Sequence, residues 1–174
     1  RPGRVWAKSV NGQHTLQSQG SALLTNWERR PEQPEAYLSY SERRSRFEKL
    51  LSFYASFLSE RGKRDVQPRS CMVRYINHIP LDDLDVASMA EKAFTCWNNQ
   101  TSDRWLAMPD TLNLQFGIPM PEKKGRLNVH ITQGFRRTDK QKIVQFDLTA
   151  RGVPTCDTIE SAMDWLDLGH EWVV

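Results

Sequence analysis

Three segments in the last third of the chain alternate between apolar and polar residues. Apolar side chains occupy every second position of residues 112–118, 127–131 and 144–148, and amides, a glycine, an imidazole and a carboxylate lie between them. A period of two is that of a β-strand with one buried and one solvated face, and antiparallel pairing is the simplest arrangement for such strands. The pattern therefore predicts a three-stranded antiparallel meander.

Three other segments have apolar residues at the three- and four-residue spacing of an α-helix. The clearest covers about residues 40–61 and begins with a capping box formed by Ser39 and Glu42. A second helix is predicted over about residues 83–98, and a third begins near Asp157. Each helix carries its apolar residues on one stripe, so each is expected to pack against a core.

Strands are also predicted in the first half of the chain. The dipeptide Asn11-Gly12 indicates a hairpin with strands Arg4–Val10 and Gln13–Gln19, because both turn positions favour positive φ and these two residues tolerate it. Residues 71–79 are rich in β-branched and aromatic side chains, which predicts a further strand.

The order of these elements is typical of an α+β fold. We expect a mostly antiparallel sheet with long amphipathic helices packed on one face, and two blocks of strands followed by a helix suggest an internal duplication. The 174 residues suit a single domain over 1–174. The start without methionine and the apolar end at Trp172-Val173-Val174 indicate a fragment or the ordered part of a longer protein.

Composition excludes several classes of protein. Mean hydropathy is −0.64, and neither an apolar run of about 18 residues nor a signal peptide is present, so we expect a soluble protein without a membrane partner. The odd number and wide spacing of the cysteines favour the reducing cytoplasm. The three cysteines, Cys71, Cys96 and Cys156, are too widely spaced for a disulfide framework or a zinc site and are expected to fill space as small hydrophobes. We predict no metal and no cofactor.

Charge is unevenly distributed along the chain. Residues 1–80 carry 14 Lys/Arg against 7 Asp/Glu, whereas residues 81–174 carry 10 against 14. One hypothesis is therefore nucleic-acid or nucleotide binding by the basic half. The simpler interpretation of the same residues is a solvated, charged helix face. The candidate phosphate-binding residues are Arg43, Arg44, Arg46, Lys63 and Arg64.

Polar side chains on the predicted strands form the main candidate site. Amides and charged groups on regular strands are held in place by rigid backbone and can orient a ligand, although exposure to solvent explains the same alternation. The leading hypothesis is a non-enzymatic binding module for a partner protein or a small polar ligand. Its candidate ligand-binding residues are Arg74, Asn77, His130, Gln145 and Asp147.

An enzyme is the remaining alternative. The sequence has no Gly-rich phosphate loop, no Gly-x-Ser-x-Gly, no His-Glu-x-x-His and no dinucleotide fingerprint, so no catalytic residue is assigned. If the strands that carry His130 and Asp147 pair, the carboxylate could orient the imidazole as a general base.

Several short stretches, read together, carry a resemblance to a known family. The most specific is Tyr75-Ile76-Asn77-His78-Ile79, and weaker matches are Gln17–Gln19, Thr25–Trp27, Gly125–Leu127, Leu148–Gly152 and Leu166–Val174. Together they resemble a sporadically distributed bacterial family of uncharacterised proteins, defined by a sequence model and not by an activity. That family also has an opening β segment before the first hairpin and a continuation after the final Trp-Val-Val.

The resemblance implies a bacterial, cytoplasmic α+β protein found in mobile or defence-associated gene neighbourhoods. It implies no reaction, cofactor or catalytic residue. One departure from the family pattern is Leu38 after Tyr37, where the family often has proline.

The last predicted helix of this chain contains Trp165 and Trp172, which would suit a homodimer.

Overall fold

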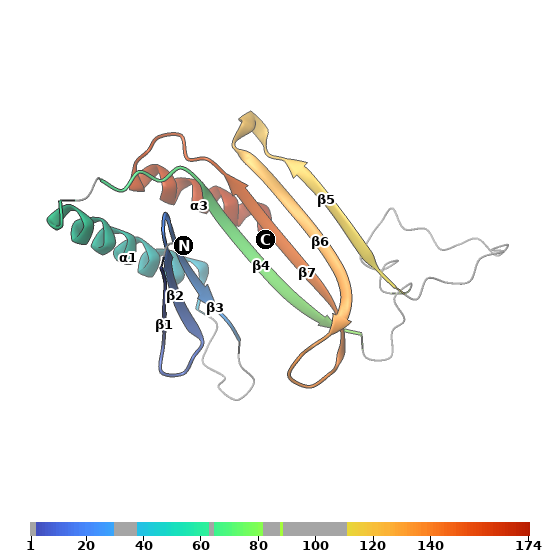
Figure 1. The fold of residues 1–174 in the computed structure, drawn as a ribbon. Coiled ribbons are helices and arrows are strands. Elements are labelled where there is room, and N and C mark those ends of the chain that lie inside the picture. The colour runs from blue at the N-terminus through green and yellow to red at the C-terminus, as the bar shows by residue number, and fades with distance from the viewer. Residues whose placement is uncertain (1–2, 30–37, 63–64, 82–87, 89–110) are drawn as a thin grey trace. The chain divides into compact units, whose positions relative to one another are not determined.

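The structure, a computed structural model, describes residues 3–29, 38–62, 65–81, 88 and 111–174. Its residues group into two compact units, Arg1–Gln67 and Pro68–Val174. Each unit contains an antiparallel sheet and a helix (Figure 1), so the predicted α+β class is confirmed. The single-domain organisation stays a prediction, and the helix predicted over residues 83–98 lies, apart from Ser88, outside the described part of the chain.

The first unit contains a three-stranded sheet in the order β1-β2-β3. Its strands are β1 (Arg4–Lys8), β2 (His14–Gln19) and β3 (Ala22–Trp27). The third strand is absent from the sequence prediction. It follows a two-residue turn whose first residue, Gly20, has a φ of +53°, and glycine at this position is typical of type II′ hairpins.

The turn between β1 and β2 differs from the predicted geometry. Gly12 has a φ of +68°, but Asn11 does not have a positive φ. The Asn11 side chain instead accepts a hydrogen bond from the backbone N–H of Gln13 at 3.1 Å, and the N–H of Gly12 donates to the Ser9 carbonyl at 2.8 Å. The longer turn makes both strands shorter than predicted.

Helix α1 (Tyr40–Glu60) begins as the sequence predicts. The Ser39 hydroxyl accepts a hydrogen bond from the Glu42 N–H at 3.3 Å, and the Glu42 carboxylate accepts one from the Ser39 N–H at 2.9 Å, which confirms the capping box. The hydrogen bonds from Ser39 also lower the pKa of Glu42. Leu51 is the fully buried residue of this helix.

The second unit contains a four-stranded antiparallel sheet in the order β4-β7-β6-β5. Its strands are β4 (Cys71–Pro80), β5 (Asn113–Pro119), β6 (Gly125–Phe135) and β7 (Lys142–Gly152). The meander from β5 to β7 and the strand at β4 are therefore confirmed. The short 3-10 turn η1 (Pro121–Lys123) lies between β5 and β6.

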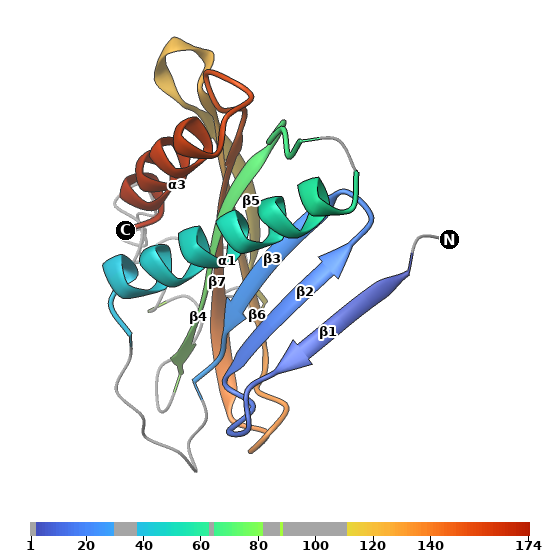
Figure 2. The same ribbon diagram turned by 90° about the vertical axis from the view of Figure 1, so that its left-hand side faces the viewer.

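Helix α3 (Ile159–Val173) covers one face of this sheet, over β4 and β7 (Figures 1 and 2). Its N-cap is Thr158 rather than the predicted Asp157, because the Thr158 hydroxyl accepts a hydrogen bond from the Ser161 N–H at 3.2 Å. The Tyr75 hydroxyl of β4 and His170 Nδ1 of α3 lie 3.2 Å apart. The core of the unit includes Leu127, Val129, Ile131, Val144, Ala150, Ala162 and Trp165.

The turn that joins β5 to β6 is bonded to α3 by a tryptophan. Two non-glycine residues of this turn, Glu122 and Lys123, have φ values of +54° and +57°, a left-handed conformation that L-residues adopt at a cost. The indole N–H of Trp165, a residue only 4% exposed, donates to the Lys124 carbonyl at 2.7 Å. This hydrogen bond fixes the strained turn against the helix.

The cysteines do not share one environment. Cys71 is buried in the core, as expected for a small hydrophobe, and burial raises the pKa of its thiol to about 11. Cys156 is exposed, which contradicts the space-filling prediction, and Cys96 lies outside the described residues.

In the described ranges, no helix combines the length and the apolar character needed to cross a membrane.

Candidate functional site

The sheet of the second unit has an apolar face under α3 and an opposite face lined mainly by polar side chains. The uninterrupted pairing places the even-numbered residues of β4 and β6 on the same face as the odd-numbered residues of β5 and β7. We call the side opposite α3 the polar face. Its polar residues are Arg74, His78, Asn113, Gln115, Arg126, Asn128, His130, Thr132, Gln145, Asp147, Thr149 and Arg151. The exposed side chains of Met72 and Ile76 also lie there.

Four of the five predicted ligand-binding residues share the polar face. Arg74, His130, Gln145 and Asp147 lie on it, and all four are exposed or half-buried. Asn77 lies on the other face of β4, opposite Phe146, because residues three apart on a strand point to opposite sides. Its grouping with Arg74 was therefore wrong.

The rungs of the sheet bring polar side chains into contact across strands. His130 lies directly opposite Asp147, which confirms that the two residues are neighbours across paired strands. The Nε2 atom of His130 is 3.2 Å from Asn113 Oδ1 on β5. One rung further along, His78 Nε2 is 3.3 Å from Gln145 Oε1. The polar face is thus a connected surface of imidazoles and amides.

Arg74 and Asp147 form the strongest polar contact on this face. Arg74 Nε donates to Asp147 Oδ1 at 2.9 Å, Arg74 Nη2 donates to Oδ2, and the Thr149 hydroxyl donates to Oδ1 at 3.1 Å. The hydrogen bond from Arg74 is the main reason that the pKa of Asp147 lies below its usual range, and partial burial opposes it. Both carboxylate oxygens are thereby engaged by residues other than His130, so this geometry gives no support to a His130–Asp147 general-base pair.

Removing the charge of Asp147 should change the pH dependence of stability. The pKa of Asp147 is lower in the folded protein than in the unfolded chain. Ionised Asp147 therefore stabilises the fold at pH values above the pKa of the unfolded chain, and this stabilisation is lost as the pH falls through the pKa of the folded protein. Asp147→Asn should therefore be about 1 kcal/mol less stable than the wild type at pH 7, and this difference should narrow as the pH falls below the ordinary pKa of an aspartate side chain. Urea unfolding at several pH values measures both quantities.

The matched control for that experiment is Asp164→Asn, because Asp164 is exposed on α3. The free energy of unfolding of Asp164→Asn should differ from that of the wild type by less than about 0.5 kcal/mol at pH 7. An Asp147→Asn deficit that stays constant down to about pH 2 would show that lost packing, and not lost charge, causes it.

The structure describes three of the five basic residues predicted for phosphate binding, Arg43, Arg44 and Arg46 of α1. Arg44 forms an ion pair with Glu48 at 2.9 Å, one turn along α1. Arg43 is half-buried and Arg46 is exposed. Lys63 and Arg64 lie outside the described residues, so nucleic-acid binding by this set stays a prediction.

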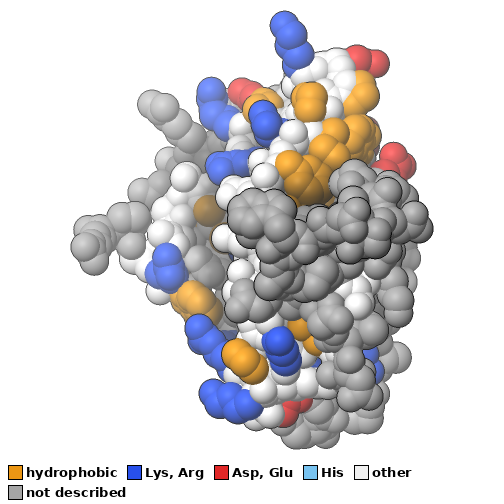
Figure 3. Space-filling view, turned by 90° about the vertical axis from the view of Figure 1, so that its right-hand side faces the viewer, with side chains coloured by type: hydrophobic (Ala, Val, Ile, Leu, Met, Phe, Trp, Pro, Cys, Tyr) orange, Lys and Arg blue, Asp and Glu red, His pale blue; other side chains and the backbone are white. Residues whose placement is uncertain are grey.

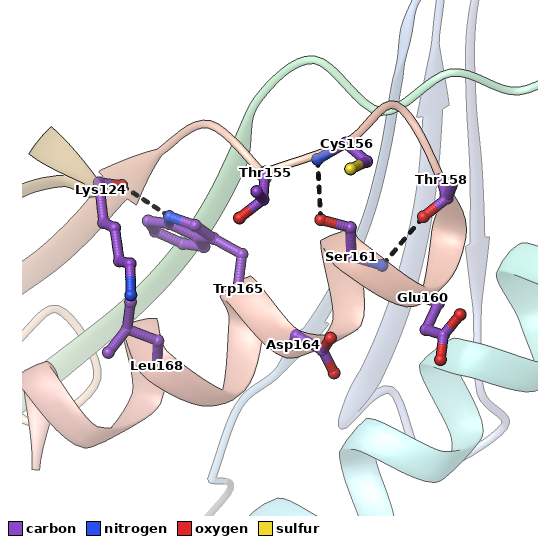
Figure 4. A pocket seen from close by; sticks show the side chains of 9 residues that line it. All are labelled: Lys124, Thr155, Cys156, Thr158, Glu160, Ser161, Asp164, Trp165 and Leu168. Carbon is purple, nitrogen blue, oxygen red and sulfur yellow. Dashed lines mark hydrogen bonds between the residues drawn. The ribbon is translucent and has the colours of Figure 1, made fainter. Parts of the chain in front are cut away.

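A second candidate is a groove of about 490 Å³ beside the start of α3 (Figure 4). Three of its polar contacts serve the fold: Ser161 bonds to Thr158 and to the Cys156 N–H, the latter at 3.0 Å, and Trp165 bonds to the Lys124 carbonyl. Within the described ranges, no group of three or more His, Cys, Asp or Glu side chains could hold a metal ion. These three hydrogen bonds are accounted for by the cap of α3 and the packing of Trp165.

Two arginines of the polar face were missed by the sequence analysis. Arg126 lies two residues before Asn128 on β6, and Arg151 lies two residues after Thr149 on β7, so both arginines are on the polar face. The alternation of polar and apolar residues along each strand could therefore have identified them. Their position directly opposite each other depends on register, which the sequence does not determine.

Comparison of the chain with protein-family models, with curated proteins and with solved structures finds no match. Membership in the bacterial family that the sequence resembles therefore stays a prediction.

Proposed function

We propose that this protein is a non-enzymatic binding module and that the polar face of the β4-β7-β6-β5 sheet binds a small polar ligand. The observation that carries the proposal is the concentration of hydrogen-bonding side chains on one exposed face of a rigid sheet whose other face is packed under α3. The sequence hypothesis also names a partner protein as the molecule that binds this face. The test below distinguishes the partner protein from a small ligand.

The contacts of the polar face support binding over catalysis. Asp147 is engaged by Arg74 and Thr149, and the nearest hydrogen-bonding partner of His130 is the Asn113 amide. Such an arrangement holds donors and acceptors in fixed positions without a free base beside a nucleophile. These features are those of recognition by hydrogen bonding.

The test is a screen of the full chain against free amino acids, nucleosides, sugars and organic acids. Binding is detected through shifts of the amide resonances in ¹H–¹⁵N spectra. We expect saturable shifts at residues of the polar face, and an approximately tenfold weaker affinity in Asn128→Ala and Gln145→Ala. The matched control is Asn77→Ala on the opposite face, which should leave the affinity unchanged. An absence of saturable shifts, or shifts confined to α3, would contradict the proposal and leave a partner protein as the occupant to test.

Four further features belong to the proposal and not to the observations: a bacterial source, a cytoplasmic location, an internal duplication and a homodimer. A bacterial source and a cytoplasmic location follow from the family resemblance. An internal duplication is supported by the presence, in each unit, of a three-stranded meander followed by a helix. A homodimer through the last helix would use the half-buried Trp172, because Trp165 is already buried within the unit.

A further inference from the structure

We propose that the first unit binds single-stranded nucleic acid on one face of the β1-β2-β3 sheet. A base stacks on the indole of Trp6, and phosphates of the same strand contact Arg4 and Lys8. The inference goes beyond the proposed function, because it concerns a different sheet and a different class of ligand.

Strand β1 places Trp6 on the more polar face of its sheet. The opposite face carries most of the apolar side chains of the three strands, and these are Val5, Ala7, Leu16, Leu23 and Trp27. We call the other face the Trp6 face; its polar residues are Arg4, Lys8, Thr15, Gln17, Gln19 and Asn26. Trp6 is 53% exposed, so burial in an apolar layer does not account for a tryptophan at this position.

The sheet that carries Trp6 has no acidic residue. Residues 4–27 include Arg4 and Lys8 but no Asp or Glu. Both cations lie on the Trp6 face, one on each side of Trp6 and about 6–7 Å from it along the strand. Strand β1 lies at one edge of the described sheet (Figure 2), and all five of its residues are exposed. A polyanion laid along β1 therefore meets positive charge on both sides of the ring.

Side-chain contacts order the groups around Trp6. Arg4 Nε donates a hydrogen bond to Gln19 Oε1 at 2.7 Å, and Gln17 Nε2 donates to the same oxygen at 3.2 Å. Arg4 Cζ lies 5.8 Å from the centroid of the Trp6 ring, which is a cation–π distance. Gln17 is directly opposite Trp6 in the register, and its amide has a further donor and a further acceptor with which to contact the edge of a stacked base.

An exposed aromatic residue of the second unit has different neighbours. Phe116 of β5 is 46% exposed, but Leu114 and Ile118 lie two residues before and after it, and Val129 lies opposite. Figure 3 shows hydrophobic side chains gathered near the top of the view, at the end of the sheet where β5 leads into η1. Around Trp6, two cations and an amide occupy the corresponding positions. The combination of stacking surface, positive charge and amide indicates nucleic acid, and exposure of an aromatic ring alone does not.

The ligand is single-stranded because the bases of a duplex are stacked on each other and offer no free face to a side chain on a sheet. Oligo(dT) and oligo(rU) of about 20 nucleotides are longer than the site sizes of known single-strand-binding domains and form no duplex by themselves, so they are suitable probes. Their comparison distinguishes DNA from RNA as the source of the strand.

The experiment is fluorescence anisotropy of the two labelled oligomers with the full chain at several NaCl concentrations. At least one oligomer should bind saturably, and log K should fall with log[NaCl] with a slope of about −1.4, because each of two phosphate contacts contributes about −0.7. Trp6→Leu should raise the Kd by roughly tenfold, whereas Trp6→Phe, which retains a stacking ring, should raise it less. Lys8→Gln and Arg4→Gln should each reduce the slope by about 0.7.

The matched controls are Arg46→Gln, at an exposed arginine of α1, and Phe116→Leu, which should both leave the Kd unchanged. A loss of affinity in Arg46→Gln without a loss in Lys8→Gln would place binding on α1 and overturn the inference. Equal binding of a DNA duplex, or equal affinity of Trp6→Leu and the wild type, would contradict stacking on Trp6. An unchanged thermal midpoint shows that each variant is folded, as expected for substitutions of exposed side chains.

Failure of both oligomers to bind would also overturn the inference. The proposed function is tested separately, because its screen uses small compounds and detects shifts on the sheet of the second unit. Either result can therefore fail while the other stands.

Discussion

Trp165→Ala should lower the free energy of unfolding of the second unit by about 3–5 kcal/mol, the usual cost of deleting a buried aromatic side chain. Trp165 is 4% exposed, and its indole N–H satisfies the Lys124 carbonyl at 2.7 Å. The substitution both opens a cavity and releases a turn with two left-handed residues, Glu122 and Lys123. Urea unfolding followed by far-ultraviolet circular dichroism measures the loss.

Two further variants separate the contributions of Trp165. Trp165→Phe removes the hydrogen bond but keeps most of the ring, so it should cost about 1–3 kcal/mol. Glu171→Ala, at an exposed position of the same helix, should cost less than about 0.5 kcal/mol. Equal stability of Trp165→Phe and the wild type would mean that the turn is not held by the indole N–H.

Gly152→Ala is expected to have the second-largest effect, a loss of about 3 kcal/mol. A Cβ atom at this position would overlap the Lys124 carbonyl oxygen and lie 2.6 Å from both Cζ2 and Nε1 of Trp165. The backbone oxygen and the packed indole have little freedom to move, so the strain falls on the contact between the sheet and α3. Thermal unfolding of the full chain would show the effect as a lower midpoint.

The matched control is Gly134→Ala on β6, because a Cβ atom there has no neighbour within 4 Å. Its stability should change by less than about 1 kcal/mol, since alanine also restricts the unfolded chain. If Gly152→Ala and Gly134→Ala were equally stable, the close packing around Gly152 would not exist in solution.

Most of the second unit could be predicted because period-two alternation and cap residues are local signals. The strands of the meander were found by alternation, and the strand at β4 was found by its β-branched and aromatic content. Strand β3 was missed because Ala22–Trp27 does not alternate and its Gly20-Ser21 turn is a weaker signal than Asn11-Gly12. The N-cap of α3 was misplaced by one residue because Asp157 and Thr158 are both good cap residues.

The candidate site was harder to predict than the fold, because it depends on which residues of neighbouring strands pair with each other. Arg74 and Asn77 are three residues apart on β4, so the period of two already places them on different faces of the sheet. Grouping the two residues in one site was an error in applying that period. The alignment of Arg126 with Arg151 depends on the six-residue connection between β6 and β7, whose geometry no local pattern specifies.

Side-chain amide resonances provide the most direct test that the polar face is the binding surface, because the sheet carries such amides on both faces. During titration with any compound that binds, the NH₂ resonances of Asn128 and Gln145 should shift saturably, whereas that of Asn77 on the opposite face should not. Shifts of Asn77 in the absence of shifts of Asn128 and Gln145 would place binding on the α3 side and contradict the account.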